Sequence, residues 1–176
     1  MRLANKLGGN MRLETKIQMY IQENGWDIDY NGRTVTNIFG TEYNVEIGCA
    51  ESYASISYVR YGSKEITIKE PCQMHLDIFG DVETIEYMSY ALAHEVAHTE
   101  TYGLPLGLSF FVLAWGIKKA ITEKDAKYLL KGSCAAIGTK FAVEESCAEL
   151  GAYLLHGASL NWEGNGKWLQ SLLDLL

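Results

Sequence analysis

The stretch Ala91-Leu92-Ala93-His94-Glu95-Val96-Ala97-His98 decides how the rest of this chain is interpreted. Residues four apart in an α-helix differ by about 40° around the helix axis, so His94 and His98 would present their imidazoles on one face, one turn apart. Glu95 would lie beside that face. The spacing predicts a helix over 82–101 that offers two nitrogen ligands to one metal ion.

Two imidazoles with a glutamate between them are typical of a zinc site in which the glutamate acts as a base toward metal-bound water. We therefore expect one Zn²⁺ per chain, with His94 and His98 as ligands and Glu95 as the catalytic base. The alternative, that both histidines are ordinary core residues, would leave three polar side chains in need of other partners.

A tetrahedral catalytic zinc needs a third protein ligand and keeps one position open. A third histidine close to the motif is excluded, because Thr101 and Leu104 stand where the extended motif has glycine and histidine. The remaining candidates are His75, His156 and the acidic segment 143–149. Of these, the glutamates of the acidic segment are favoured.

Glu145 and Glu149 share one face of a helix that we predict over 134–156. If this helix packs antiparallel against the motif helix, Glu145 would complete the zinc sphere and Glu149 would accept a hydrogen bond from a liganding histidine. The alternative is that both are exposed helical charges. Tyr153 and His156 continue the same stripe and are candidate transition-state donors, although His156 would lie about 16 Å along the axis from Glu145.

The rest of the chain predicts an α+β fold in one domain, 1–176, with a loose start over 1–10. A first helix runs from Leu13 and ends at Asn24-Gly25, and a small, mostly antiparallel sheet follows. The expected strands are Thr34–Phe39, Tyr43–Ile47, Ser55–Tyr61 and Glu65–Lys69, with a hairpin turn at Tyr30–Arg33. Glu65–Lys69 is the expected edge strand.

The second half predicts a series of helices, because strand signals fade after Asp81 and helix-start residues appear. They are placed near 82–101, 105–120, 123–131, 134–156 and 166–175. Gly132 and Gly157 are the expected C-terminal stops.

The net charge of −7 and the pI of about 5.1 argue against a protein that binds nucleic acid over a broad surface. The four cysteines lack paired CxxC spacing, so reduced, buried thiols are expected. The apolar run Leu104–Ile117 is shorter than the ~20 residues of a spanning helix and favours a buried core helix with no stable membrane span. Because no signal-peptide pattern is present, we expect a cytoplasmic protein.

With these motifs in order, the chain resembles the gluzincins, peptidases with an HExxH helix and a glutamate ligand on a later helix. Glu145-Ser146-Cys147-Ala148-Glu149 is similar to their ExxA(N/D) segment, whose first glutamate is the third zinc ligand. Within that clan the chain most resembles the small ImmA/IrrE group of bacterial and phage metallopeptidases. The resemblance implies a zincin-like fold and a bacterial or phage-infected host cell.

Three functions follow as hypotheses. The first is a zinc endopeptidase acting on a protein or peptide substrate, with Glu95 as general base. The second is a zincin-fold regulatory binding module with little or no peptidase activity. The third is a membrane-associated peptidase that uses Leu104–Ile117 as a shallow anchor.

Overall fold

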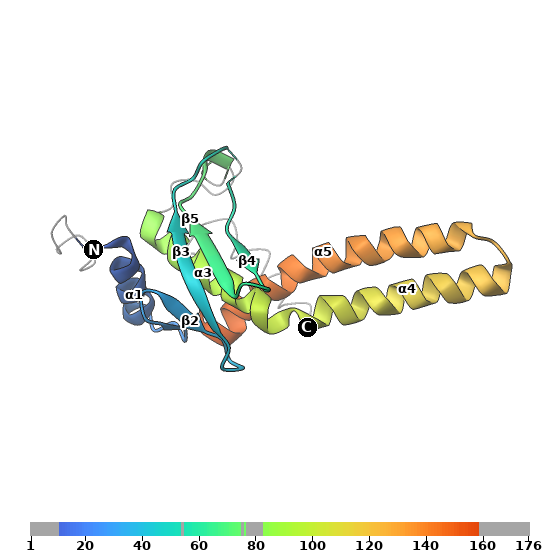
Figure 1. Cartoon of the computed structure of the whole chain (residues 1–176), viewed down its shortest axis with the longest axis horizontal. Coiled ribbons are helices and arrows are strands. Elements are labelled where there is room, and N and C mark those ends of the chain that lie inside the picture. Colours follow the sequence, from blue (N-terminus) through green and yellow to red (C-terminus); the bar gives the residue numbers. More distant parts are fainter. Residues whose placement is uncertain (1–10, 54, 75, 77–82, 159–176) are drawn as a thin grey trace, which may run out of the picture.

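A five-stranded sheet is followed by three long helices in the computed structural model, which describes residues 11–53, 55–74, 76 and 83–158 (Figure 1). The elements are α1 (Leu13–Glu23), β1 (Asp29–Tyr30), β2 (Thr34–Thr36), β3 (Glu42–Gly48), β4 (Tyr58–Arg60), β5 (Glu65–Lys69), α3 (Thr84–Thr101), α4 (Gly103–Glu123) and α5 (Lys127–His156). The predicted α+β class is confirmed. The expected loose start, 1–10, and the expected helix 166–175 lie outside the described residues.

The sheet is mixed rather than uniformly antiparallel. Its strand order is β1-β2-β3-β5-β4, and β3 pairs with β5 in parallel while the other described pairs are antiparallel. The predicted hairpin turn joins β1 to β2. There the Asn31 side-chain oxygen accepts the backbone N–H groups of Arg33 and Thr34, and Gly32 adopts a φ of 90° that favours glycine.

The prediction that Glu65–Lys69 forms an edge strand is wrong. These residues form β5, which lies between β3 and β4, and its central residues Ile66, Thr67 and Ile68 are all buried. A strand covered on both faces and paired on both sides is typical of the sheet interior. The short strand β4 is the edge on this side.

The two helices expected at 123–131 and 134–156 are one helix, α5, so the predicted stop at Gly132 is wrong. A Cβ atom added at Gly132 would lie 2.7 Å from the Cα atom of Gly116, so glycine allows α4 and α5 to cross closely here. Gly157, with a φ of 66°, does follow the end of α5 as predicted.

Helix α4 and the first half of α5 form an antiparallel hairpin that projects away from the sheet (Figure 1). Only Pro105 and Gly116 of α4 are buried. The expectation that Leu104–Ile117 forms a buried core helix is therefore wrong, because α5 packs along one side of α4 and leaves the rest open. By length and composition α4 could cross a membrane.

The cysteines are free thiols, but the expectation that they are buried holds for Cys72 alone. Cys49 and Cys134 are exposed, and Cys147 is half-buried. In the described part of the chain the fold therefore rests on packing and hydrogen bonds.

A buried ion pair joins the far ends of α3 and α5. Glu100 Oε2 lies 2.8 Å from His156 Nε2, and His156 Nδ1 lies 2.6 Å from the backbone oxygen of Asp27. The second oxygen of Glu100 accepts the N–H of Ile38 at 2.9 Å. Burial disfavours a charged imidazole, but the hydrogen bonds to Glu100 and Asp27 outweigh it and raise the pKa of His156. This contact locks both helices onto the segments around β1 and β2.

Replacing His156 by glutamine should lower the free energy of unfolding by about 3–5 kcal/mol at pH 6, because Glu100 would stay buried without its cationic partner. Since the pKa of His156 is raised on folding, the stabilisation is complete below a pH of about 6.5 and is lost as the pH rises through the folded-state pKa. Urea unfolding of the metal-free wild type and His156→Gln from pH 6 to 9 measures the difference. A difference that stays constant over this range would contradict a charged pair.

Candidate metal centre

The two histidines of the motif converge on one point at the inner face of α3. His94 Nε2 and His98 Nε2 are 3.1 Å apart, and the two rings are nearly perpendicular. His98 is buried and His94 is half-buried, so neither imidazole is freely solvated. The sequence prediction that both rings share one face is confirmed.

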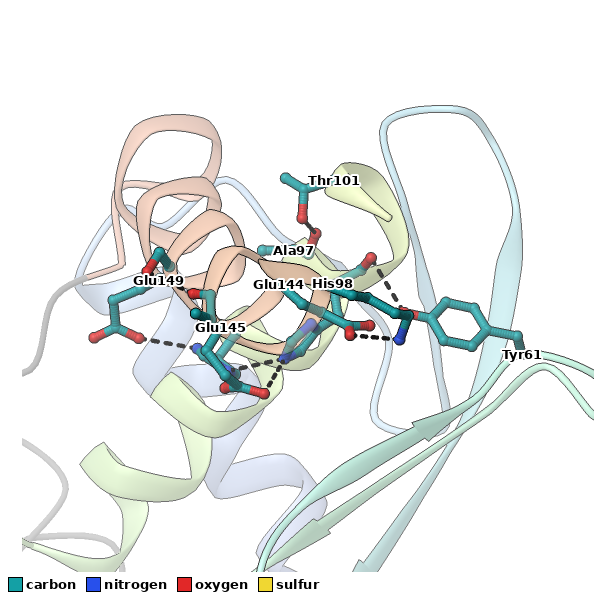
Figure 2. Close-up of polar contacts among 11 residues, drawn as sticks. Tyr61, Ala97, His98, Thr101, Glu144, Glu145 and Glu149 are labelled. Atoms are coloured by element: carbon teal, nitrogen blue, oxygen red, sulfur yellow. Dashed lines mark hydrogen bonds and ion pairs between the residues drawn. The ribbon is translucent and has the colours of Figure 1, made fainter. Parts of the chain in front are cut away.

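Glu145 reaches this point from α5. Its Oε2 lies 3.3 Å from His94 Nε2, and its Oε1 lies 3.7 Å from His98 Nε2 (Figure 2). Ligand atoms bound 2.0–2.2 Å from a tetrahedral zinc are about 3.3–3.5 Å from one another. The two ring nitrogens, 3.1 Å apart, and the two Glu145 oxygens, at 3.3 Å and 3.7 Å from one nitrogen each, have separations within a few tenths of an ångström of that range. The Glu145 side chain is 71% exposed, which leaves access from solvent.

Glu149 contacts the other ring nitrogen of His94, Nδ1. Its Oε2 lies 3.0 Å from His94 Nδ1, and it also takes part in a hydrogen bond with the side chain of Tyr90. A hydrogen bond donated from Nδ1 fixes the tautomer of His94 and leaves the lone pair on Nε2. The two glutamates thus occupy separate positions, one at the ligand point and one behind a histidine.

Glu95 lies buried beside the histidines, and one ligand atom from each of His94, Glu95 and His98 falls within 4.8 Å of the others. Burial raises the pKa of Glu95 to about 7, with the charge of His94 opposing the rise and that of Glu145 adding to it. A carboxyl with such a pKa can accept and release a proton near neutral pH. We refer to His94, Glu95, His98, Glu145 and Glu149 as the histidine–glutamate cluster.

The charges of this cluster favour a cation between its members. Burial lowers the pKa of a histidine, but for His94 the hydrogen bonds to Glu145 and Glu149 outweigh it and raise the pKa to about 10. For His98, burial and the neighbouring charge of His94 lower the pKa. The two imidazoles therefore share one positive charge, which the carboxylates attract. A divalent cation at the same point fits this donor set.

Small residues let α5 come close enough to α3 for these contacts. A Cβ atom added at Gly151 would lie 2.9 Å from Ala97 Cβ and 3.3 Å from Thr101 Cγ2. Ala148 and Ala152, on either side of Gly151, are fully buried. A larger side chain on this face would push the helices apart and move Glu145 and Glu149 away from His94.

The other candidates from the sequence lie elsewhere. Both ring nitrogens of His156 are used in the buried contact with Glu100 and Asp27, so its role as a transition-state donor is not supported. Tyr153 lies one turn beyond Glu149 and is 40% exposed, and its role stays a prediction. His75 lies outside the described residues.

Two tyrosines beside the cluster were missed by the sequence prediction. Tyr90 lies one turn before His94 on α3, a spacing that could have identified it. Tyr61 directly follows β4, and its hydroxyl donates to the backbone oxygen of His98 at 3.3 Å (Figure 2). No sequence signal places Tyr61 there, because the contact depends on how the sheet packs against α3.

Comparison of the chain with models of known protein families, with curated proteins and with solved structures finds no match. The interpretation of the cluster therefore depends on its own geometry and chemistry.

Replacing Gly151 by valine should weaken zinc binding by roughly 10–100-fold, because the added side chain displaces α5 and both of its glutamates. Gly138→Val, the same change elsewhere on α5, is the matched control, since a Cβ atom at Gly138 meets nothing within 4 Å. Competition with a chelating fluorophore measures both affinities. Wild-type zinc affinity in Gly151→Val would contradict the need for this close approach.

Removing the Glu145 carboxylate should abolish stoichiometric zinc binding, whereas removing that of Glu149 should weaken it by roughly 10–100-fold. Elemental analysis of the purified Glu145→Ala and Glu149→Ala variants tests this. Glu144→Ala is the control, because Glu144 lies on the same helix but pairs with Lys140 at 2.8 Å. The ligand assignment fails if Glu145→Ala keeps one zinc per chain.

Proposed function

We propose that this protein is a zinc-dependent endopeptidase. The observation that supports this most strongly is the position of Glu145. This residue follows His98 by 47 positions and lies on a different helix, yet its carboxylate lies near the Nε2 atoms of both motif histidines. A histidine pair alone would be compatible with an ordinary core. Two imidazoles and an accessible carboxylate at zinc-ligand separations, with a buried glutamate beside them, are typical of a hydrolytic centre.

In this proposal His94, His98 and Glu145 hold the zinc, which supplies a Lewis acid that lowers the pKa of a bound water. Glu149 keeps His94 in the ligating tautomer through the 3.0 Å contact with Nδ1. Tyr90 in turn holds the carboxylate of Glu149. Each of these side chains thus restricts the freedom of the next.

Glu95 carries the proton in the proposed reaction. Its carboxylate takes a proton from the attacking water and passes it to the amine of the leaving peptide. In the metal-free protein burial raises the pKa of Glu95 to about 7, so this carboxyl is a weaker acid, and its carboxylate a better proton acceptor, than an exposed glutamate. The side chain lies on α3 between the two histidines, so the α3 backbone fixes its position relative to the cluster.

The free edge of β4 is where an extended substrate would lie. Among the described strands β4 pairs with β5 alone, and Tyr61 at its end contacts the backbone of His98. A peptide that added to this edge by backbone hydrogen bonds would run past the histidine–glutamate cluster. The proposal therefore places the substrate on β4, the observed edge strand, and not on Glu65–Lys69, the edge strand expected from the sequence.

Glu95→Gln should keep its zinc and lose activity by about 10²–10⁴-fold, because an amide cannot accept the proton. Zinc-loaded wild type and variant are incubated with a peptide library prepared from a cell lysate, and new peptide ends are counted by mass spectrometry. Glu46→Gln, the same change at an exposed residue of β3, should cleave like the wild type.

Unchanged cleavage by Glu95→Gln would remove the assigned role of this residue. If the zinc-loaded wild type leaves every peptide intact but holds a partner protein equally well with and without Glu95, the protein is a regulatory binding module instead.

A further inference from the structure

The projecting hairpin of α4 and α5 exposes apolar side chains on more than one face. One line on α4, which we call the first line, consists of Leu104, Leu108, Phe111 and Trp115. A second line, about 120° away around the helix, consists of Phe110, Ile117 and Ile121. A helix on the surface of a soluble protein keeps its apolar side chains on one face, toward a core. Here no described element covers either line.

The three aromatic side chains in these lines are all more than half exposed: Phe110 is 62%, Phe111 78% and Trp115 51% exposed. Phe111 has this exposure although it lies in the middle of the chain and inside a regular helix. Residues 103–117 contain no charged side chain. At 1.5 Å per residue, this uncharged stretch of helix is about 22 Å long. This is shorter than the ~30 Å hydrocarbon core of a bilayer. The segment fits shallow insertion better than a full crossing.

Positive charge gathers at the tip of the hairpin. Residues 118–131 contain five lysines and two acidic residues, a net charge of 5 − 2 = +3, whereas the whole chain has a net charge of −7. The five are Lys118, Lys119, Lys124, Lys127 and Lys131. The remaining residues together therefore carry −7 − 3 = −10, so the tip is a basic segment of an acidic protein, and an anionic surface would attract it.

The way in which the two helices pack agrees with a lipid environment. Gly116 and Gly132 meet at the crossing of α4 and α5, where a Cβ atom on either would lie 2.7 Å from the other's Cα. Contact through small residues lets helices associate without a large apolar interface between them. Large apolar side chains are then left to face outward.

We propose that the α4–α5 hairpin is a membrane-binding element that inserts both apolar lines into the boundary between headgroups and acyl chains of a bilayer containing anionic lipids. The lysines at its tip contact the lipid phosphates. A second copy of this chain would cover one line and leave the other exposed, whereas lipid covers both. This inference is independent of the proposed peptidase activity, because no cluster residue takes part in it.

Flotation with vesicles tests the proposal on the full chain. Wild type should float with phosphatidylcholine vesicles that contain one-third phosphatidylserine, and more weakly with phosphatidylcholine alone. Phe111→Ser combined with Trp115→Ser should lower binding to both by at least about tenfold. Phe39→Ser is the matched control, because the Phe39 side chain is 69% exposed but lies at the turn after β2, away from the hairpin. This variant should bind vesicles like the wild type. Equal far-ultraviolet circular dichroism spectra and equal urea unfolding midpoints in all variants show that the fold is retained.

Replacing Lys118, Lys119 and Lys124 by glutamine should weaken binding to the anionic vesicles by roughly fivefold per lysine and leave binding to phosphatidylcholine unchanged. Absence of the wild type from the vesicle fraction, or flotation of Phe111→Ser/Trp115→Ser equal to that of the wild type, would overturn the proposal. Light scattering without lipid then separates the remaining explanations. A wild-type dimer that this double variant dissociates would show that a second copy covers the hairpin.

Discussion

The close approach of α5 to α3 is the constraint on which the rest of this structure depends. Gly151 lies against Ala97 with room for no side chain, and buried alanines continue the contact on either side. This short distance brings Glu145 and Glu149 within reach of His94. It also brings the end of α5 to Glu100, where His156 closes the buried ion pair. Small side chains bury little apolar area themselves, so burial at α1, the sheet and α3 must supply most of the stability.

The histidine–glutamate cluster brings carboxylates and imidazoles together, so opposite charges can stabilise one another there. Three carboxylates within one small region would repel one another and are costly to bury. Burial opposes a charge on either imidazole, but the hydrogen bonds to Glu145 and Glu149 raise the pKa of His94, whereas burial and the charge of His94 lower the pKa of His98. A positive charge on His94 offsets part of the cost of the carboxylates. A divalent cation would offset more of it without using a proton. Under the proposed function, the arrangement that makes the metal-free cluster electrostatically unfavourable is the one that would favour a bound metal.

The sequence predicted those parts of the site that follow from spacing along one helix. His94 and His98 share a face because they are four residues apart, and Glu145 and Glu149 do so for the same reason. Features that depend on distant segments were missed or misjudged. Gly132 has the local signature of a helix stop, but its contact with Gly116 gives it another role. The central position of β5 depends on parallel pairing with β3, and the position of Tyr61 depends on the packing of β4 against α3.

The hairpin and the cluster are mechanically linked because both use the same helix. α5 has 30 residues, about 45 Å at 1.5 Å per residue, and it runs without a break from the lysine-rich tip to His156. A tilt at the tip would move Glu145 and Glu149 unless the base of the helix were fixed. Two contacts fix the C-terminal end of α5, one before and one after Tyr153. They are the close approach of Gly151 to Ala97 and the buried ion pair of His156 with Glu100. Gly151 and His156 therefore anchor the C-terminal end of α5, and Glu145 and Glu149 lie within two helical turns of Gly151 on the side of the hairpin.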